Sequence, residues 1–231
     1  MPLPPVHRIG WRPAYRIVSS RFPPVGLFDA IAEPGDLEAL HEIEGLTNPR
    51  LREEMGQIHL VPPGRRIAGP GTTPIMAAFT HPNPEGSRFS PGDFGVYYAA
   101  LDRETAIRET VHHRSRFLAR TREPRCQLEM RCYLGDLVGE LHDIRGGWPD
   151  LHDPHSYVAS QRAAAEWRAA GSNGLVYDSV RHVGGQCAAV FHPDLLGPVR
   201  QGAHLSYHWD GARIERVVIA EQTILIAGGD D

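Results

Sequence analysis

Gly86 to Glu109 read GSRFSPGDFGVYYAALDRETAIRE, and this run predicts a loop, a strand and a helix in succession. The loop presents Arg88 among glycine, serine and proline residues, which suit turns and allow a backbone to approach a ligand closely. We expect a strand over residues 94–100. A helix should begin after Asp102, whose side-chain oxygen can accept hydrogen bonds from the first helical turn.

The predicted strand and helix each direct one candidate side chain. Alternation sends Tyr98 to one face of the strand and Tyr97 to the other, so the two tyrosines cannot serve the same purpose. The apolar residues of the helix recur at helical spacing, at Ile107, Val111 and Leu118, and Glu109 lies off this stripe. Arg88, Tyr98 and Glu109 could therefore meet around a bound anion whose reacting carbon becomes cationic. Taken singly, they also fit a solvated loop residue, a core aromatic and a surface helix residue.

The composition predicts one globular domain. The chain has 231 residues, of which 41% are hydrophobic and 23% charged, enough for a sizeable core. The net charge is -4, the pI is near 6.3, and no segment is markedly enriched in Lys and Arg, so we expect no nucleic-acid partner. No segment resembles a signal peptide or approaches the roughly 20 apolar residues of a membrane span. These features predict a cytoplasmic protein without a membrane partner.

The cysteines and histidines do not indicate a metal site. Cys126 and Cys132 share the apolar face of one predicted strand, and together with Cys187 they are expected to be buried, unreactive thiols. The densest group of histidines and acidic residues, at 150–155, lies in a proline-broken loop without helical ligand spacing. We therefore predict no metal.

The remaining elements mix strands and helices. A proline-rich arm over residues 1–13 is expected to precede a strand at 14–20 that carries Arg16, and a strand at 174–180 delivers Ser179. Further strands are predicted at 57–61, 125–133 and 187–191, helices at 36–44, 48–56 and 156–170, and a helix or strand at 74–80. Near the end of the chain, residues 204–209 and 212–220 flank Asp210-Gly211, a favoured two-residue hairpin turn. This mixture predicts an α+β fold with mainly antiparallel sheets packed on each other and edged by helices.

The candidate residues occur in a definite order along the chain. Their motifs are Arg16 on an early strand, Arg88 in Gly-x-Arg-aromatic, Tyr98 in Tyr-Tyr-Ala, Glu109 in Ala-x-x-Glu, Trp167, and Ser179 in Tyr-Asp-Ser-Val-Arg. Over residues 14–195 this ordered set resembles the RES-domain family, the toxins of Xre/RES toxin–antitoxin pairs, which include ParS/ParT-like type II systems. Three features depart from the family pattern. Gly-Ser-Arg-Phe-Ser replaces the usual Gly-Gly-Arg-Trp-Asn, Asp-Ser replaces Pro-Ser, and the inserted segment 34–85 is longer than usual.

The resemblance implies a fold and an activity. The fold would be ADP-ribosyltransferase-like, a split sandwich with flanking helices in one domain over residues 14–231, with a hairpin at 200–220. The activity would be that of a toxin enzyme that cleaves the nicotinamide–ribose bond of NAD+ and transfers ADP-ribose to a cellular protein.

Each candidate residue has a role in this chemistry. Arg16 and Arg88 would bind the diphosphate as planar donors, and Tyr98 would stack on the nicotinamide. Glu109 would stabilise the ribosyl cation, and Ser179 would orient Glu109 or a ribose hydroxyl.

The resemblance also implies partners, and alternatives stay open. The expected partner is an Xre-like antitoxin that occludes the pocket near Arg88 and Tyr98, and the acceptor could be an enzyme of nucleotide-precursor synthesis. The same chemistry could instead destroy NAD+ by hydrolysis or phosphorolysis. A non-catalytic interaction module is a further alternative. A nuclease is disfavoured by the acidic charge and by the lack of a phosphate-cleaving acid/base or metal set.

Overall fold

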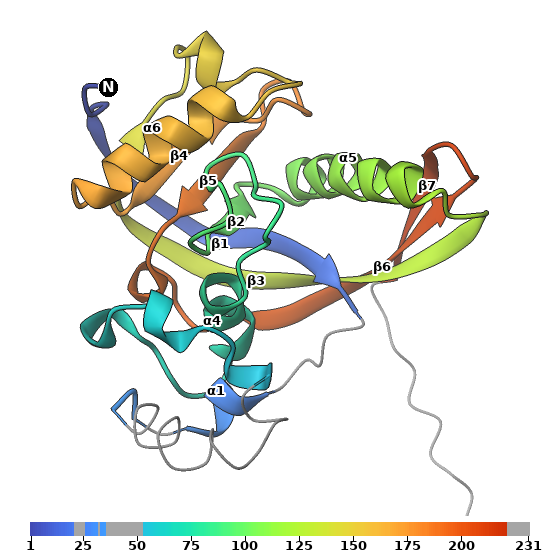
Figure 1. Cartoon of the computed structure of the whole chain (residues 1–231). Coiled ribbons are helices and arrows are strands. Elements are labelled where there is room, and N and C mark those ends of the chain that lie inside the picture. The colour runs from blue at the N-terminus through green and yellow to red at the C-terminus, as the bar shows by residue number, and fades with distance from the viewer. Residues whose placement is uncertain (21–25, 32, 36–52, 221–231) are drawn as a thin grey trace, which may run out of the picture.

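The computed structural model describes residues 1–20, 26–31, 33–35 and 53–220. Within these residues seven strands form one sheet in the order β1-β2-β5-β4-β3-β6-β7 (Figure 1). The strands are β1 (Val6–Ser19), β2 (Tyr97–Ala100), β3 (Cys126–Asp143), β4 (Gly174–Asp178), β5 (Gln186–Val190), β6 (Arg200–Trp209) and β7 (Ile214–Ala220). All strand pairs are antiparallel except β3 with β4. The molecule is thus a mixed fold with a mainly antiparallel sheet, as predicted.

The two longest strands, β1 and β3, pair with each other along most of their length. They pair from Val6 opposite His142 to Ser19 opposite Met130, with a shift in register at Pro13, which lacks the N–H that a regular ladder requires. On its other edge β3 pairs with β6 and then with β4, while β1 also pairs with β2. The pairings of β1, β2, β5, β4 and β3 therefore form a closed circuit, from which β6 and β7 extend.

Two predictions about the strands are corrected by this topology. All strands belong to one hydrogen-bonded sheet instead of separate sheets packed as a split sandwich, because β3 is long enough to pair with β6 at one end and β4 at the other. The first strand begins at Val6, so residues 6–13 of the predicted proline-rich arm belong to β1, and residues 6–11 pair with β3. The prolines at positions 2, 4 and 5 all precede the strand, where no ladder donor is needed.

Buried side chains form two hydrophobic clusters, one on each face of the sheet. Tyr97 and Ala99 belong to the first cluster, whereas Tyr98 packs against the second, which contains Ala100. The predicted separation of the two tyrosines is therefore confirmed. Because successive side chains of a strand alternate, one short strand contributes to both cores.

Helices cover both faces of the sheet (Figure 1). α1 (Leu27–Ala30) and α4 (Thr73–Thr80) contribute buried residues to the first cluster, and α5 (Arg103–Thr121) and α6 (Val158–Ala169) contribute to the second. Asp102 caps α5 as predicted, because its side chain accepts a hydrogen bond from the Thr105 N–H at 2.8 Å. Short 3-10 helices lie at Ile58–Leu60, Pro63–Arg65, Pro149–Leu151 and Pro193–Leu195.

Several local predictions differ from the structure. Residues 57–61 contain a 3-10 helix instead of a strand, and residues 94–96 precede β2 without joining it. The β6–β7 turn spans four residues, since the N–H of Asp210 donates to the Arg213 carbonyl at 3.0 Å. The helix predicted at 36–44 lies outside the described residues, as does the one at 48–56 apart from its last turn.

Candidate active site

A cavity of about 770 Å³ lies between helix α5, strands β1 and β2, and the loop that carries Arg88. Arg16, Arg88, Tyr98 and Glu109 all line this cavity, although they come from four separate elements. Ser179 joins them through a direct hydrogen bond to Glu109. The structure therefore brings all five candidate residues together.

Arg88 is held in a buried position by the chain that leads into helix α6. The side chain is only 6% exposed, and its Nη1 donates to the carbonyl oxygens of Leu151 at 3.1 Å and Asp153 at 2.9 Å. The guanidinium lies 4.5 Å from the centre of the Tyr157 ring. Its orientation is therefore fixed before any ligand arrives, which suits recognition of an anion by a planar donor.

Tyr98 anchors the Arg88 loop to strand β2. Its hydroxyl accepts a hydrogen bond from the Phe89 N–H at 2.9 Å and contacts the Ser87 hydroxyl at 2.8 Å. Burial raises the pKa of Tyr98 to about 12, so the phenol remains protonated near neutral pH. The loop turns sharply at Gly86, which has a φ of +75° and no room for a side chain, because a Cβ would lie 2.8 Å from the Ser90 carbonyl oxygen.

The Glu109 carboxylate and the Ser179 hydroxyl form a hydrogen-bonded pair in the site. Ser179 follows β4, and its Oγ donates to Glu109 Oε1 at 2.6 Å, a distance typical of a charge-assisted hydrogen bond. The same Oγ accepts the backbone N–H groups of Arg181 at 3.1 Å and His182 at 3.0 Å. Since the hydroxyl has one proton and two acceptor positions, these contacts fix its direction and keep its proton on the carboxylate side.

Arg16 reaches the cavity from strand β1. Its Nη1 donates to the Tyr98 carbonyl at 3.0 Å, and its guanidinium lies 4.4 Å from the centre of the Tyr97 ring. Its Nε is buried and has no hydrogen-bond partner among the residues that the structure describes. Burial lowers the pKa of Arg16 from its usual value, and an anionic ligand would counter that cost.

Positive charge dominates the cavity lining. Five arginines line it, at positions 16, 88, 114, 116 and 120, against the two carboxylates of Glu85 and Glu109. Glu85 forms an ion pair with Arg120 at 2.7 Å, and both side chains are exposed. Burial and the Arg181 guanidinium lower the pKa of His113, the histidine in the lining, to about 4, so this side chain is neutral near pH 7. A chain with a net charge of -4 thus concentrates arginines around one cavity.

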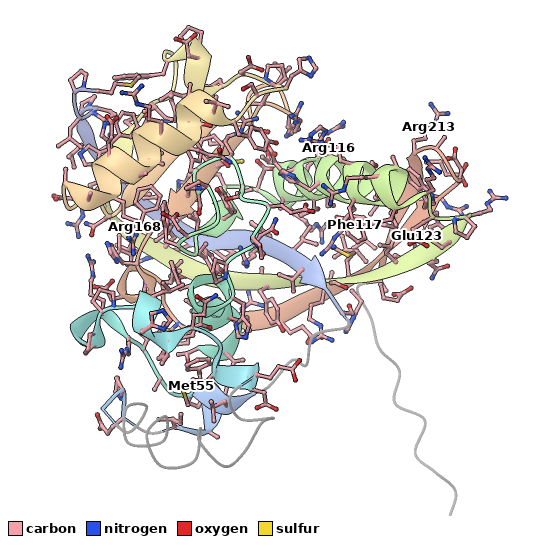
Figure 2. The ribbon with its side chains drawn as sticks, viewed as in Figure 1. Met55, Arg116, Phe117, Glu123, Arg168 and Arg213 are labelled. Atoms are coloured by element: carbon pink, nitrogen blue, oxygen red, sulfur yellow. The ribbon has the colours of Figure 1, made fainter. Side chains whose placement is uncertain are left out.

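Helix α5 supplies both charge and an aromatic surface to the cavity. Arg116 and Phe117 both line it, and they leave the helix on different sides (Figure 2). Phe117 is 45% exposed, a large exposed fraction for a phenylalanine side chain. Sequence analysis did not select either residue, because an Arg-Phe pair near the end of a helix carries no specific signal.

The structure also shows supporting residues that sequence analysis missed. Thr105 is completely buried, and its Oγ1 donates to Asp102 Oδ2 at 2.7 Å and lies 2.8 Å from His182 Nδ1. The contact with Asp102 could be anticipated, because a threonine three residues after a capping aspartate lies within reach of its side chain. Nothing in the sequence pattern links Thr105 to a histidine 77 positions later.

Three other features of the sequence lie apart from the cavity chemistry. Trp167 packs inside the second cluster and donates from its indole to the Met1 carbonyl at 3.3 Å. Asp153 Oδ1 accepts the backbone N–H groups of His155 at 2.7 Å and Ser156 at 2.9 Å, so this carboxylate shapes the loop. Across residues 1–20, 26–31, 33–35 and 53–220, no group of three His, Cys, Asp or Glu side chains is placed to hold a metal.

The cysteines are free thiols in the described part of the chain. Cys132 and Cys187 are buried and Cys126 is half-buried. Cys187 lines the cavity, but burial raises the pKa of its thiol far above neutrality, so it remains a weak nucleophile. No helix within the described ranges has the length and hydrophobicity of a membrane span.

Comparison with known proteins shows similarity to a family, to a relative and to a solved structure. Residues 63–210 match the family described as the RES domain. The chain is 34% identical over 207 residues to a protein of Sinorhizobium fredii named "Uncharacterized protein y4oC", an alignment that covers 87% of this chain and 84% of that protein. A chain in the crystal structure of the M. tuberculosis MbcT–MbcA toxin–antitoxin complex aligns with 89% of this chain and 88% of its own length, at 14% identity and a TM-score of 0.45.

Proposed function

The chain belongs to the RES-domain family, and we propose that it is a toxin enzyme that cleaves the nicotinamide–ribose bond of NAD+ and transfers ADP-ribose to a cellular protein. One observation carries the proposal. Glu109, bonded to Ser179, lines the same cavity as five arginines. A volume of about 770 Å³ lies within the range of small-molecule sites. The dinucleotide presents the two features that this lining suits, a diphosphate anion and a sugar carbon that becomes cationic.

The arginines bind the diphosphate in this proposal. Arg88 is buried and its Nη1 donates to two carbonyl oxygens, which fix its orientation. The buried Nε of Arg16 can donate to a ligand. Guanidinium groups donate pairs of parallel hydrogen bonds to phosphate oxygens. Tyr98 holds the loop that carries Arg88, and its ring supplies a flat surface for the nicotinamide.

Glu109 acts on the bond that breaks. The C1′–N bond cleaves with its electron pair remaining on the nicotinamide nitrogen, which becomes neutral, and positive charge develops at C1′. A carboxylate beside C1′ stabilises that charge more in the transition state than in the ground state, which lowers the barrier. Ser179 holds the carboxylate in place. A nucleophilic group of the acceptor protein then forms the new bond to C1′ and loses its proton.

NAD+ labelled in its adenylate phosphate tests the reaction and its acceptor. The protein is incubated with it in plain buffer, in phosphate buffer and in cell lysate, with the Glu109→Gln variant as the matched control. We expect label attached to a lysate protein, and such an acceptor could be an enzyme of nucleotide-precursor synthesis. Label released as free ADP-ribose in buffer would instead assign hydrolysis, and a product that requires phosphate would assign phosphorolysis. Release of no nicotinamide in any arm would refute the enzymatic proposal and favour a non-catalytic interaction module.

The proposed toxin requires a protein that neutralises it, because unrestrained consumption of NAD+ would harm the host. We expect an Xre-like antitoxin to cover the cavity entrance near Arg88 and Tyr98. Co-expression should relieve growth arrest, and addition of the purified antitoxin should abolish NAD+ turnover. An antitoxin that binds without reducing turnover would exclude occlusion as its mode of action.

A further inference from the structure

The loop after strand β4, residues 179–185, contacts helix α5 at two points one helical turn apart. At the first point Ser179 Oγ donates to Glu109 Oε1 at 2.6 Å. At the second point His182 Nδ1 lies 2.8 Å from Thr105 Oγ1. Thr105 and Glu109 are separated by four residues and therefore share one face of the helix. The loop that delivers Ser179 is thus held on the same face that presents the carboxylate.

Hydrogen-bond directions around Thr105 can be deduced from its partners. An ionised aspartate only accepts hydrogen bonds, so the single proton of the Thr105 hydroxyl points to Asp102 Oδ2, 2.7 Å away. Burial raises the pKa of Asp102, but hydrogen bonds from Thr105 outweigh it and leave that pKa below its usual value. The hydroxyl oxygen must then accept from His182, which requires the proton on Nδ1. The resulting chain runs from His182 through Thr105 to Asp102.

The backbone of the loop contacts helix α5 so closely at Gly185 that no side chain fits between them. A Cβ at Gly185 would lie 2.4 Å from Thr105 Oγ1, so only glycine fits there. The loop is also closed on itself, because the Ser179 N–H donates to the Gly185 carbonyl at 2.8 Å and the Gly185 N–H donates to the His182 carbonyl at 3.0 Å. A shift of His182 would therefore move Ser179 with it.

We propose that Thr105 and His182 are positioning residues, which clamp the 179–185 loop to helix α5 and so hold Ser179 against Glu109. This inference rests on the proposed function for its kinetic consequence, but the clamp itself can be observed without substrate. Neither side chain is assigned a contact with NAD+. Their loss should therefore lower kcat and leave the affinity for NAD+ nearly unchanged.

Two pairs of substitutions test the clamp in the full-length protein. Thr105→Val removes the hydroxyl at nearly constant shape, and Thr105→Ser restores it. His182→Leu removes the donor, and His182→Asn can donate from a position close to that of Nδ1. We expect a fall of about 10- to 100-fold in kcat for valine and leucine, as for other residues that orient a reacting group. Serine and asparagine should recover most of it. Thr121→Val, on the same helix but bonded to its own backbone, is the control and should retain the parent rate.

The outcomes separate the clamp from a general loss of structure. An unchanged kcat in the valine and leucine variants would overturn the proposal, as would a rise in KM at constant kcat. If Thr105→Val fails to fold, His182→Leu decides, because His182 lies in a surface loop. The ¹⁵N chemical shifts of the His182 ring give a readout that needs no turnover. The proton should reside on Nδ1 in the parent protein, and a ring protonated only on Nε2 would contradict the clamp even if NAD+ proved not to be the substrate.

Discussion

Replacing Glu109 by glutamine removes one negative charge from the cavity and changes little else. The amide keeps an oxygen that can still accept the Ser179 hydroxyl, now 2.6 Å from Oε1, and the side-chain volume is nearly constant. The hydrogen bond loses its charge assistance, which should cost about 1 kcal/mol of folding stability. Binding of NAD+ in its ground state should hardly change, because that state carries no full positive charge at C1′.

Loss of the carboxylate charge should raise the free energy of the transition state far more than that of the ground state. At a separation of about 4 Å and an effective dielectric constant of about 20, two unit charges attract each other by about 4 kcal/mol. A partly developed cation would experience somewhat less. We therefore expect kcat to fall by about 10²- to 10³-fold, comparable to the loss of other preorganised electrostatic groups.

Nicotinamide release under saturating NAD+ measures kcat, and calorimetric titration measures the affinity. Glu85→Gln is the matched control, since it also removes one carboxylate from the cavity lining, but at the exposed ion pair with Arg120. It should leave kcat unchanged. The assignment of Glu109 fails if its glutamine variant is folded, binds NAD+ and releases nicotinamide at the parent rate.

Three further outcomes follow from the same structure. Arg88→Lys should raise the Kd for NAD+ because lysine cannot present a planar fork, at about 1.5–3 kcal/mol for each charge-assisted hydrogen bond lost, and an unchanged Kd in titration would remove Arg88 from the diphosphate site. Tyr98→Phe leaves the buried N–H of Phe89 without its acceptor, so urea denaturation should show a loss of about 1–3 kcal/mol, and full stability would contradict the anchoring role. Burial and the nearby Arg65 lower the pKa of His192 from 6.5 to about 4, so the unfolded chain binds its proton first as the pH falls. Stability should therefore be lost between pH 6.5 and 4, by up to about 3 kcal/mol from this group, and His192→Asn should flatten that part of the pH profile measured by thermal melts.

Local pattern was sufficient for much of the scaffold around the site. The alternation in residues 94–100 separated Tyr97 from Tyr98, and the cap at Asp102 located the start of helix α5, because both depend on neighbours within a few residues. The order of arginine, tyrosine, glutamate and serine motifs gave the family before any geometry was known. The length of β1 was underestimated, because the prolines near its start suggested a break, whereas Pro13 is accommodated at a register shift.

What the sequence determined by itself is the set of candidate site residues and the elements that carry them, since capping, alternation and turn chemistry are local. Only the tertiary structure decided how those elements meet. The single closed sheet follows from β3 pairing with β1, β4 and β6 at once, a choice among long-range partners that no local pattern specifies. The contact of Thr105 with His182 and that of Ser179 with Glu109 join residues 77 and 70 positions apart, and they exist because β4 ends beside the first turns of α5. Hydrogen bonds of this kind depend on positions in space to within a few tenths of an ångström, and folding sets those positions through the packing of the whole core.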